Sequence, residues 1–162
     1  MSAEQRLAEL GLELPGPPQV PPELQVPFRW VRISGNRVYV SGHIPLEADG
    51  SIAQPLGRVG SDLTVEQGYE AARKLGLAML GSLRSELGDL DRITAWLRAF
   101  AIVNCASGFY KAPMVTNGFS DLILELFGPE IGAHARSTIG GLPAFNAPIE
   151  IEAEVEIGSV ER

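Results

Sequence analysis

The side chains best suited to binding or catalysis lie in the last third of the chain. Arg136 stands in a segment of otherwise small or apolar residues, and Glu150 opens a run of alternating glutamates. A guanidinium binds a carboxylate through two parallel hydrogen bonds, so Arg136 is a candidate anchor for an organic acid. The alternative is an ion pair between Arg136 and one of the glutamates. The residue types alone leave both interpretations open.

The glutamates belong to a predicted strand over residues 148–157. Apolar residues occupy every second position of this segment, and the positions between them are Glu150, Glu152, Glu154 and Glu156. A period of two places the two sets on opposite faces of a strand. We expect the last three glutamates to form a solvated face. Glu150 differs because it lies at the Pro148 end, where a loop can bring it to a cleft.

Other chemistries have weaker support in the sequence. Cys105 ends an apolar run, where cysteines are usually inert core residues. His43, His134 and Cys105 do not have the spacing of zinc ligands, so no metal site is expected. No glycine-rich phosphate-binding motif occurs, which disfavours nucleotide binding. We therefore expect neither a metal nor an organic cofactor.

Composition limits the class of protein. The chain has 162 residues, 45% of them hydrophobic and 20% charged, which predicts one globular domain with a real core. Thirteen Lys and Arg against 20 Asp and Glu give a net charge of −7, which disfavours a nucleic-acid partner. A single cysteine and the lack of a membrane-length apolar run predict a soluble, cytoplasmic protein with no membrane partner.

The N-terminal part differs in composition from the rest. Residues 3–10 have helical leucine spacing and end at Gly11, and five of the twelve prolines follow in residues 15–22. Proline fixes φ and removes a donor, so this stretch predicts an extended connector. We expect residues 1–25 to form a short helix and a proline-rich extension, and residues 26–162 to form one domain.

The elements of that domain follow from periodicity and turn signals. Strands are expected at residues 30–34 and 37–44, joined by a tight turn at Gly35-Asn36, with a further short strand at 51–53. One helix starts with a capping box, Thr64 with Gln67, and ends at Gly88; its internal glycines predict close packing on a sheet. A strand over 92–105 and a second helix from Pro113 to Gly128-Pro129 follow. Strands at 134–140 and 148–157 close the chain.

This order predicts an α+β fold, a mixed sheet with two helices on one face. Such a sheet leaves its other face uncovered. We therefore expect self-association over that face.

The closing segment AHARSTIGGLPAFNAPIEIEAEVEI resembles the signature of the RidA (YjgF) family: an Ala-Arg pair, a Leu-Pro, then a strand that alternates glutamate and isoleucine. The strand segment VYVSGHIP is similar to a family strand that ends in Ser-Gly-Gln-Ile-Pro. The two predicted helices fall where the family has helices, so the resemblance covers residues 26–157.

The resemblance implies a chorismate-mutase-like fold and a homotrimer with a central barrel and ligand clefts between subunits. It also implies hydrolysis of reactive 2-imino or 2-enamino acids to 2-keto acids and ammonia, without a cofactor. Arg136 would hold the substrate carboxylate and Glu150 would place or activate water. The other residues that it places at the ligand are Thr138, Asn117, Ser41, Gly42 and Phe28.

Several departures from the family pattern indicate a divergent branch. Phe28 replaces a tyrosine, His43 replaces a glutamine, and the loop after Leu142-Pro143 is longer than usual. Two other functions stay open at this point. A binding module for a small carboxylate needs Arg136 but not Glu150. Ribonuclease activity, a label often given to the family, is disfavoured by the net charge.

Overall fold

The computed structural model describes residues 1–159. The chain runs through the helices and strands α1 (Ala3–Glu9), β1 (Val31–Ser34), β2 (Arg37–His43), α2 (Val65–Leu87), η1 (Leu90–Arg92), β3 (Ile93–Asn104), α3 (Ala112–Gly132), β4 (Ala135–Gly141), η2 (Ala144–Asn146) and β5 (Ile149–Ile157). This order confirms the predicted α+β class.

The five strands form one mixed sheet in the order β1-β2-β5-β3-β4. Neighbouring strands are antiparallel except β3 and β4, which are parallel and are joined by the crossover helix α3. A parallel pair requires such a crossover, because its strands cannot be joined by a tight turn. β4 is last in the strand order and is therefore an edge strand, with one row of backbone groups free to pair.

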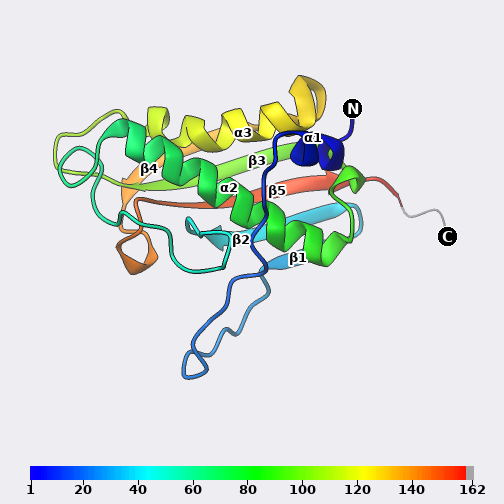
Figure 1. The fold of residues 1–162 in the computed structure, drawn as a ribbon, viewed down its shortest axis with the longest axis horizontal. Helices are drawn as coiled ribbons and strands as arrows, with labels where there is room; N and C mark the ends of the chain where they lie inside the picture. The colour runs from blue at the N-terminus through cyan, green and yellow to red at the C-terminus, as the bar shows by residue number, and fades with distance from the viewer. Residues whose placement is uncertain (160–162) are drawn as a thin grey trace.

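Helices α2 and α3 lie side by side over one face of the sheet (Figure 1). The alternation of β5 decides which of its residues they cover: the apolar set of Ile149 to Ile157 is buried, and the glutamates point to the other face. Trp96 of β3 is buried under α3, with its ring edge-on to Phe119 and Phe127. The hydrophobic core therefore lies between the sheet and the two helices.

Local signals in the sequence account for most element ends. The Thr64 hydroxyl accepts from the backbone N–H of Gln67, and the Gln67 side chain accepts from the backbone of Thr64, which confirms the capping box. Gly35 and Asn36 form the predicted two-residue turn between β1 and β2, with Gly35 at a φ of 63°. Gly88 ends α2, also with a positive φ.

Three expectations about local structure were wrong. Residues 51–53 do not form a strand, because only an isolated bridge joins Leu46 and Ile52. α3 breaks at Gly128, as predicted, but resumes for one more turn to Gly132. The glycines of α2 pack against other elements than the sheet: Gly76 against Leu122 of α3, and Gly81 against the Pro15 carbonyl.

The N-terminal segment packs onto the same core. Leu7 of α1 is buried among core residues, and the Asp91 carboxylate accepts from the Ala3 backbone N–H at 2.8 Å. Pro15 is buried against α2, and from there the chain extends as a long loop away from the helices before it enters β1 (Figure 1). The boundary between extension and domain at residue 25 stays a prediction.

The second face of the sheet is not covered by any element of the described chain. It carries the β5 glutamates together with exposed apolar side chains, Tyr39 of β2 and Ile139 of β4 among them. Within residues 1–159, no helix is both long and apolar enough to span a membrane.

Candidate functional site

Arg136 lies on the edge strand β4 and points toward the helix side of the sheet. Its register partner on β3 is Ala99, which is buried on that side. The guanidinium donates from Nη1 to Asn117 Oδ1 at 2.9 Å and to Ser120 Oγ at 3.0 Å, and from Nη2 to the Pro113 carbonyl at 3.3 Å. All three acceptors belong to α3, so the helix fixes the position of the guanidinium.

These bonds use three of the five N–H donors of Arg136. Within residues 1–159, Nε–H and one Nη2–H have no acceptor, and no carboxylate lies within ion-pair distance. The ion-pair interpretation of Arg136 was therefore wrong for this part of the chain. Partial burial lowers the pKa of Arg136, but a guanidinium stays charged at neutral pH. The result is a fixed cation with two donors to spare.

His134 supports this arrangement from two residues upstream. Its Nδ1 lies 2.7 Å from the Gly132 carbonyl, so Nδ1 carries the proton, and its Nε2 lies 2.9 Å from Ser120 Oγ. Burial lowers the pKa of His134, which favours the neutral ring. The Ser120 hydroxyl therefore donates to His134 and accepts from Arg136, and this makes a continuous chain of hydrogen bonds.

Thr138 lies two residues further along the same face of β4. Its hydroxyl donates to Thr116 Oγ1 at 3.1 Å, and the Thr116 hydroxyl donates to the Ala112 carbonyl. Three predicted site residues therefore share one location. We call these three residues, together with Ser120 and His134, the arginine cluster: Arg136, Asn117, Ser120, His134 and Thr138.

Glu150 lies in a different setting, near the start of β5. Its Oε1 accepts from the Ala144 backbone N–H at 3.2 Å. Its Oε2 lies against Gly42 of β2: a Cβ at that position would be 2.6 Å from Oε2. Glycine at position 42 is thus what makes room for the carboxylate. Among the described residues, Oε2 has no hydrogen-bond donor.

The segment before β1 lies beside Glu150. The Ser41 hydroxyl donates to the Arg29 carbonyl at 2.7 Å, and the Ser41 backbone N–H donates to the Trp30 carbonyl. Through these two hydrogen bonds Ser41 holds the segment before β1 in place. Phe28 packs edge-on against Trp30, which in turn packs against the buried ring of His43. We call this set the glutamate cluster: Phe28, Ser41, Gly42, His43 and Glu150.

A cavity of about 570 Å³ opens at the glutamate cluster. Phe28, Gly42 and Glu150 line it, together with apolar residues of the extension and of the loop after β2. This volume lies in the usual range of small-molecule sites. Burial lowers the pKa of His43 to about 4, so Glu150 is the one charged side chain in the lining at neutral pH.

The two clusters lie apart in a single chain. Arg136 is on the helix side of the sheet, whereas Glu150 pairs with Ile102 and points to the uncovered side. Strand β3 also separates their strands in the sheet order. The structure therefore brings Arg136 together with Asn117 and Thr138, and Glu150 together with Gly42 and Phe28, but it does not join the two sets.

Comparison with known proteins identifies the family of this chain. Residues 4–146 match the family model described as "YjgF/chorismate_mutase-like, putative endoribonuclease". The chain belongs to this family. The mixed sheet, with its helices on one face, is the fold of that family.

Several known proteins are similar to this YjgF-family chain. It is 39% identical over 128 residues to protein TCP17 of Trypanosoma cruzi, a match that covers 78% of each chain. It resembles Atu1372 of Agrobacterium tumefaciens with a TM-score of 0.85 and 36% identity, over 96% of this chain and 92% of the other. RidA of an Antarctic Psychrobacter is more distant: TM-score 0.55 and 15% identity, over 88% and 94%.

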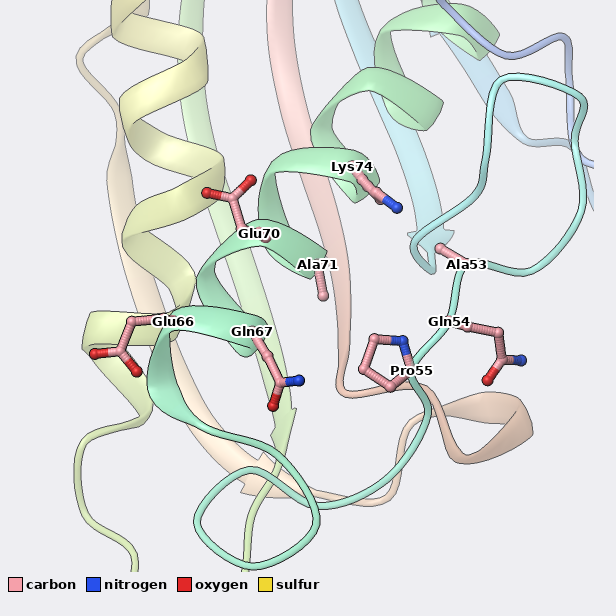
Figure 2. Close-up of a pocket in the computed structure, with 8 residues that line it drawn as sticks. All are labelled: Ala53, Gln54, Pro55, Glu66, Gln67, Glu70, Ala71 and Lys74. Carbon is pink, nitrogen blue, oxygen red and sulfur yellow. The ribbon is translucent and has the colours of Figure 1, made fainter.

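A second hollow of this YjgF-family protein lies between α2 and the loop at residues 53–55 (Figure 2). It is smaller, about 240 Å³. Glu66 and Glu70 point away from the loop, on the opposite side of α2 from Lys74 (Figure 2). Lys74 forms an ion pair with Glu47 at 2.6 Å. Its charged groups do not point toward one another, so this hollow is a weaker candidate for binding or catalysis than the two clusters.

The described part of the chain holds no group of three metal-ligating side chains that could bind a metal ion. Cys105 is partly buried against the core, and burial raises the pKa of its thiol. A thiol with a raised pKa is a poor nucleophile at neutral pH. This agrees with the prediction that Cys105 is a packing residue.

Sequence reasoning missed Ser120 and His134. Both carried a usable signal. Ser120 follows Asn117 by three residues and shares its helix face, and His134 precedes Arg136 by two residues and shares its strand face. Their significance depends on α3 crossing β4 at this height, which residue spacing does not show.

Proposed function

We propose that this protein hydrolyses 2-imino acids and their 2-enamino tautomers to 2-keto acids and ammonia. The reaction would take place without a cofactor, at sites that two neighbouring copies share. The observation that carries the proposal is Arg136, a fixed guanidinium with two unused donors on an open sheet edge. Membership of the YjgF family supports the same direction.

The arginine cluster would bind the substrate carboxylate. Its Nε–H and remaining Nη2–H can donate to the two carboxylate oxygens in parallel, the geometry that gives arginine its specificity for carboxylates. Asn117 and Ser120 hold the other side of the guanidinium, so it would need little reorganisation when the substrate binds. The Thr138 backbone would lie beside the ligand.

Glu150 would supply acid–base catalysis. Water attacks C2 of the protonated imine while Glu150 accepts a proton from the water, the C=N π electrons move to nitrogen, and the new C–O bond gives a neutral tetrahedral carbinolamine. Glu150 then returns the proton to nitrogen. The C–N bond breaks, ammonia leaves with the electron pair, and the second water proton is lost as C2 becomes a ketone. One water is consumed for each ammonia released.

Both clusters are required at one substrate, so the proposal includes an assembly. The uncovered sheet face and the edge strand β4 offer the surfaces on which copies would meet. A homotrimer with the arginine cluster of one copy opposite the glutamate cluster of the next would complete the site. The assembly state is a proposal, and its test is sedimentation of the full chain.

Turnover of freshly generated 2-iminopropanoate tests the function, with semicarbazide to trap the imine that remains. Wild type should accelerate its loss. Arg136→Ala should reduce kcat/KM at least 100-fold, because the carboxylate loses its charged partner. Glu150→Gln should reduce kcat and leave KM nearly unchanged. Wild type equal to buffer for several imino acids would refute catalysis and leave carboxylate binding as the function.

Mixing the two inactive variants tests the shared site. If Arg136 and Glu150 of one site come from different copies, a random trimer of Arg136→Ala and Glu150→Gln chains regains about a quarter of the wild-type sites. A double variant, Arg136→Ala with Glu150→Gln, mixed with wild type at matched dose is the control for exchange. No recovery, with exchange shown by mass, would contradict a site built between copies.

A further inference from the structure

We infer that the cavity beside Glu150 is a side-chain pocket for 2-imino acids with large apolar side chains, branched or aromatic. The inference rests on the proposed function and names its substrate class. One wall of the pocket comes from the end of the N-terminal extension and the residue that follows it, and it includes Val20, Leu24 and Val26.

The lining of the cavity is apolar on several sides. Phe28 and Trp30 also line it, and the loop after β2 adds Ile44 and Leu46. Such a surface gains little from a methyl-sized substituent, because most of it would stay in contact with water. A branched or aromatic side chain removes much more apolar area from water.

The electrostatics of the cavity select the reacting end of the ligand. Glu150 is its one charged side chain at neutral pH, since His43 is buried and neutral. The His43 ring is also engaged at both nitrogens, by the Ser41 carbonyl and the Ser82 hydroxyl. A lone carboxylate in a largely apolar lining is complementary to a protonated imine nitrogen on an apolar body.

The position of Glu150 directs that nitrogen. Oε1 is held by the Ala144 N–H, whereas Oε2 faces Gly42 and has no donor within residues 1–159. Oε2 is thus free to accept from an iminium N–H or from the attacking water. A ligand whose nitrogen meets Oε2 would have its side chain directed into the apolar part of the cavity.

The extension is anchored on both sides of the pocket wall, so the wall is not a free tail. Upstream, Pro15 is buried and its carbonyl lies against Gly81 of α2. Downstream, Ser41 binds the carbonyls of Arg29 and Trp30. The wall between these points is therefore fixed at both ends.

The test compares imino acids produced in the assay by an L-amino-acid oxidase with catalase, from leucine, phenylalanine and alanine. We expect kcat/KM for the leucine- and phenylalanine-derived imino acids to exceed that for 2-iminopropanoate at least tenfold. Leu24→Gln, on the exposed wall, should lower the leucine-derived value about tenfold and the alanine-derived value by less than about twofold. Glu23→Gln, one residue away and outside the lining, is the matched control.

Binding of the 2-keto acid products separates this inference from the proposed function. By calorimetry, 4-methyl-2-oxopentanoate should bind more tightly than pyruvate, and Leu24→Gln should abolish the difference. If this selective binding is observed but no imino acid is turned over, the deaminase is refuted and the apolar pocket stands. Equal kcat/KM for all three imino acids, or equal losses for all of them in Leu24→Gln, would overturn the pocket and keep the deaminase. Neither turnover nor selective binding would overturn both.

Discussion

The arginine cluster and the glutamate cluster are held in place by different means. In the arginine cluster, side chains position side chains: Asn117 and Ser120 of α3 hold Arg136, and His134 holds Ser120. In the glutamate cluster the backbone positions the side chain. The Ala144 N–H holds one oxygen of Glu150, and an absent side chain at Gly42 makes room for the other.

This contrast matches the elements that carry each cluster. The arginine cluster stands on a helix and a strand, whereas the glutamate cluster borders a loop that contains Phe145 and Asn146 with φ of 57° and 56°. Positive φ is costly for residues with side chains and persists only where other contacts impose it. The cation is thus preorganised by side-chain hydrogen bonds and the carboxylate by the shape of the backbone. Different substitutions should therefore disturb the two clusters.

Acid should destabilise both clusters, because burial lowers the pKa of His43 and of His134, and the larger effect should come from His43 in the glutamate cluster. Its pKa is about 4 in the folded protein against 6.5 unfolded, so between those values the unfolded chain binds a proton that the folded chain does not. Stability should therefore fall as the pH drops from 6.5 to 4, by up to about 3 kcal/mol. Urea unfolding at pH 7 and pH 4.5 measures this. His43→Gln should lose less over the same range, and an equal loss would assign the acid sensitivity elsewhere.

Gly42→Ala should damage the glutamate cluster without any change to Glu150 itself. The new Cβ would lie 2.6 Å from Glu150 Oε2, so the carboxylate must move away from the reacting atoms. We expect kcat to fall about 100-fold, equivalent to about 2.7 kcal/mol, with little change in the melting temperature. Gly16→Ala, where the added methyl meets open space, is the control. Normal kcat in Gly42→Ala would show that this carboxylate position is not needed.

Ser120→Ala should affect the arginine cluster more mildly. Arg136 keeps Asn117 and the Pro113 carbonyl but loses one of its three bonds, so the guanidinium becomes less well ordered. We expect KM to rise about tenfold while kcat changes little, since only carboxylate binding is weakened. Ser85→Ala, an exposed serine of α2, is the matched control. A loss confined to kcat would instead place Ser120 in the chemical step.

The smallest expected effect concerns the loop beside Glu150. Asn146 adopts a left-handed conformation and accepts from Asn104 Nδ2 at 3.0 Å. Both Asn146→Gly and Asn146→Ala remove this bond, but only glycine tolerates the positive φ without cost. The glycine variant should therefore be more stable by about 1 kcal/mol in chemical unfolding. Equal stability would show that the loop relaxes and that backbone shape does not hold this cluster.

Much of the fold was predictable because its signals are local. The alternation over residues 149–157 fixes the buried face of β5 without knowledge of its neighbours. The Thr64 capping box and the Gly35-Asn36 turn act within a few residues. The glycines of α2 were misjudged because the sequence shows that they allow a close approach, but not which element approaches.

The candidate site was less predictable for a related reason. Arg136 and Glu150 could be named from residue types and from family resemblance. Their placement on opposite sides of the sheet follows from the strand order and from the parallel pairing of β3 with β4, both of which are long-range properties. The cavity also depends on where the extension returns to the core. Composition alone predicts an extended connector there, without a role.

The two anchors of the extension have a consequence for how this protein can change over generations. A segment fixed at both ends is a closed loop, and the entropy of closing a loop grows only slowly with its length. Its prolines further reduce the freedom lost on folding. Substitutions and small insertions between Pro15 and Arg29 should thus cost little stability. Related proteins could acquire new substrate preferences through sequence changes in this loop, while the catalytic residues stay the same.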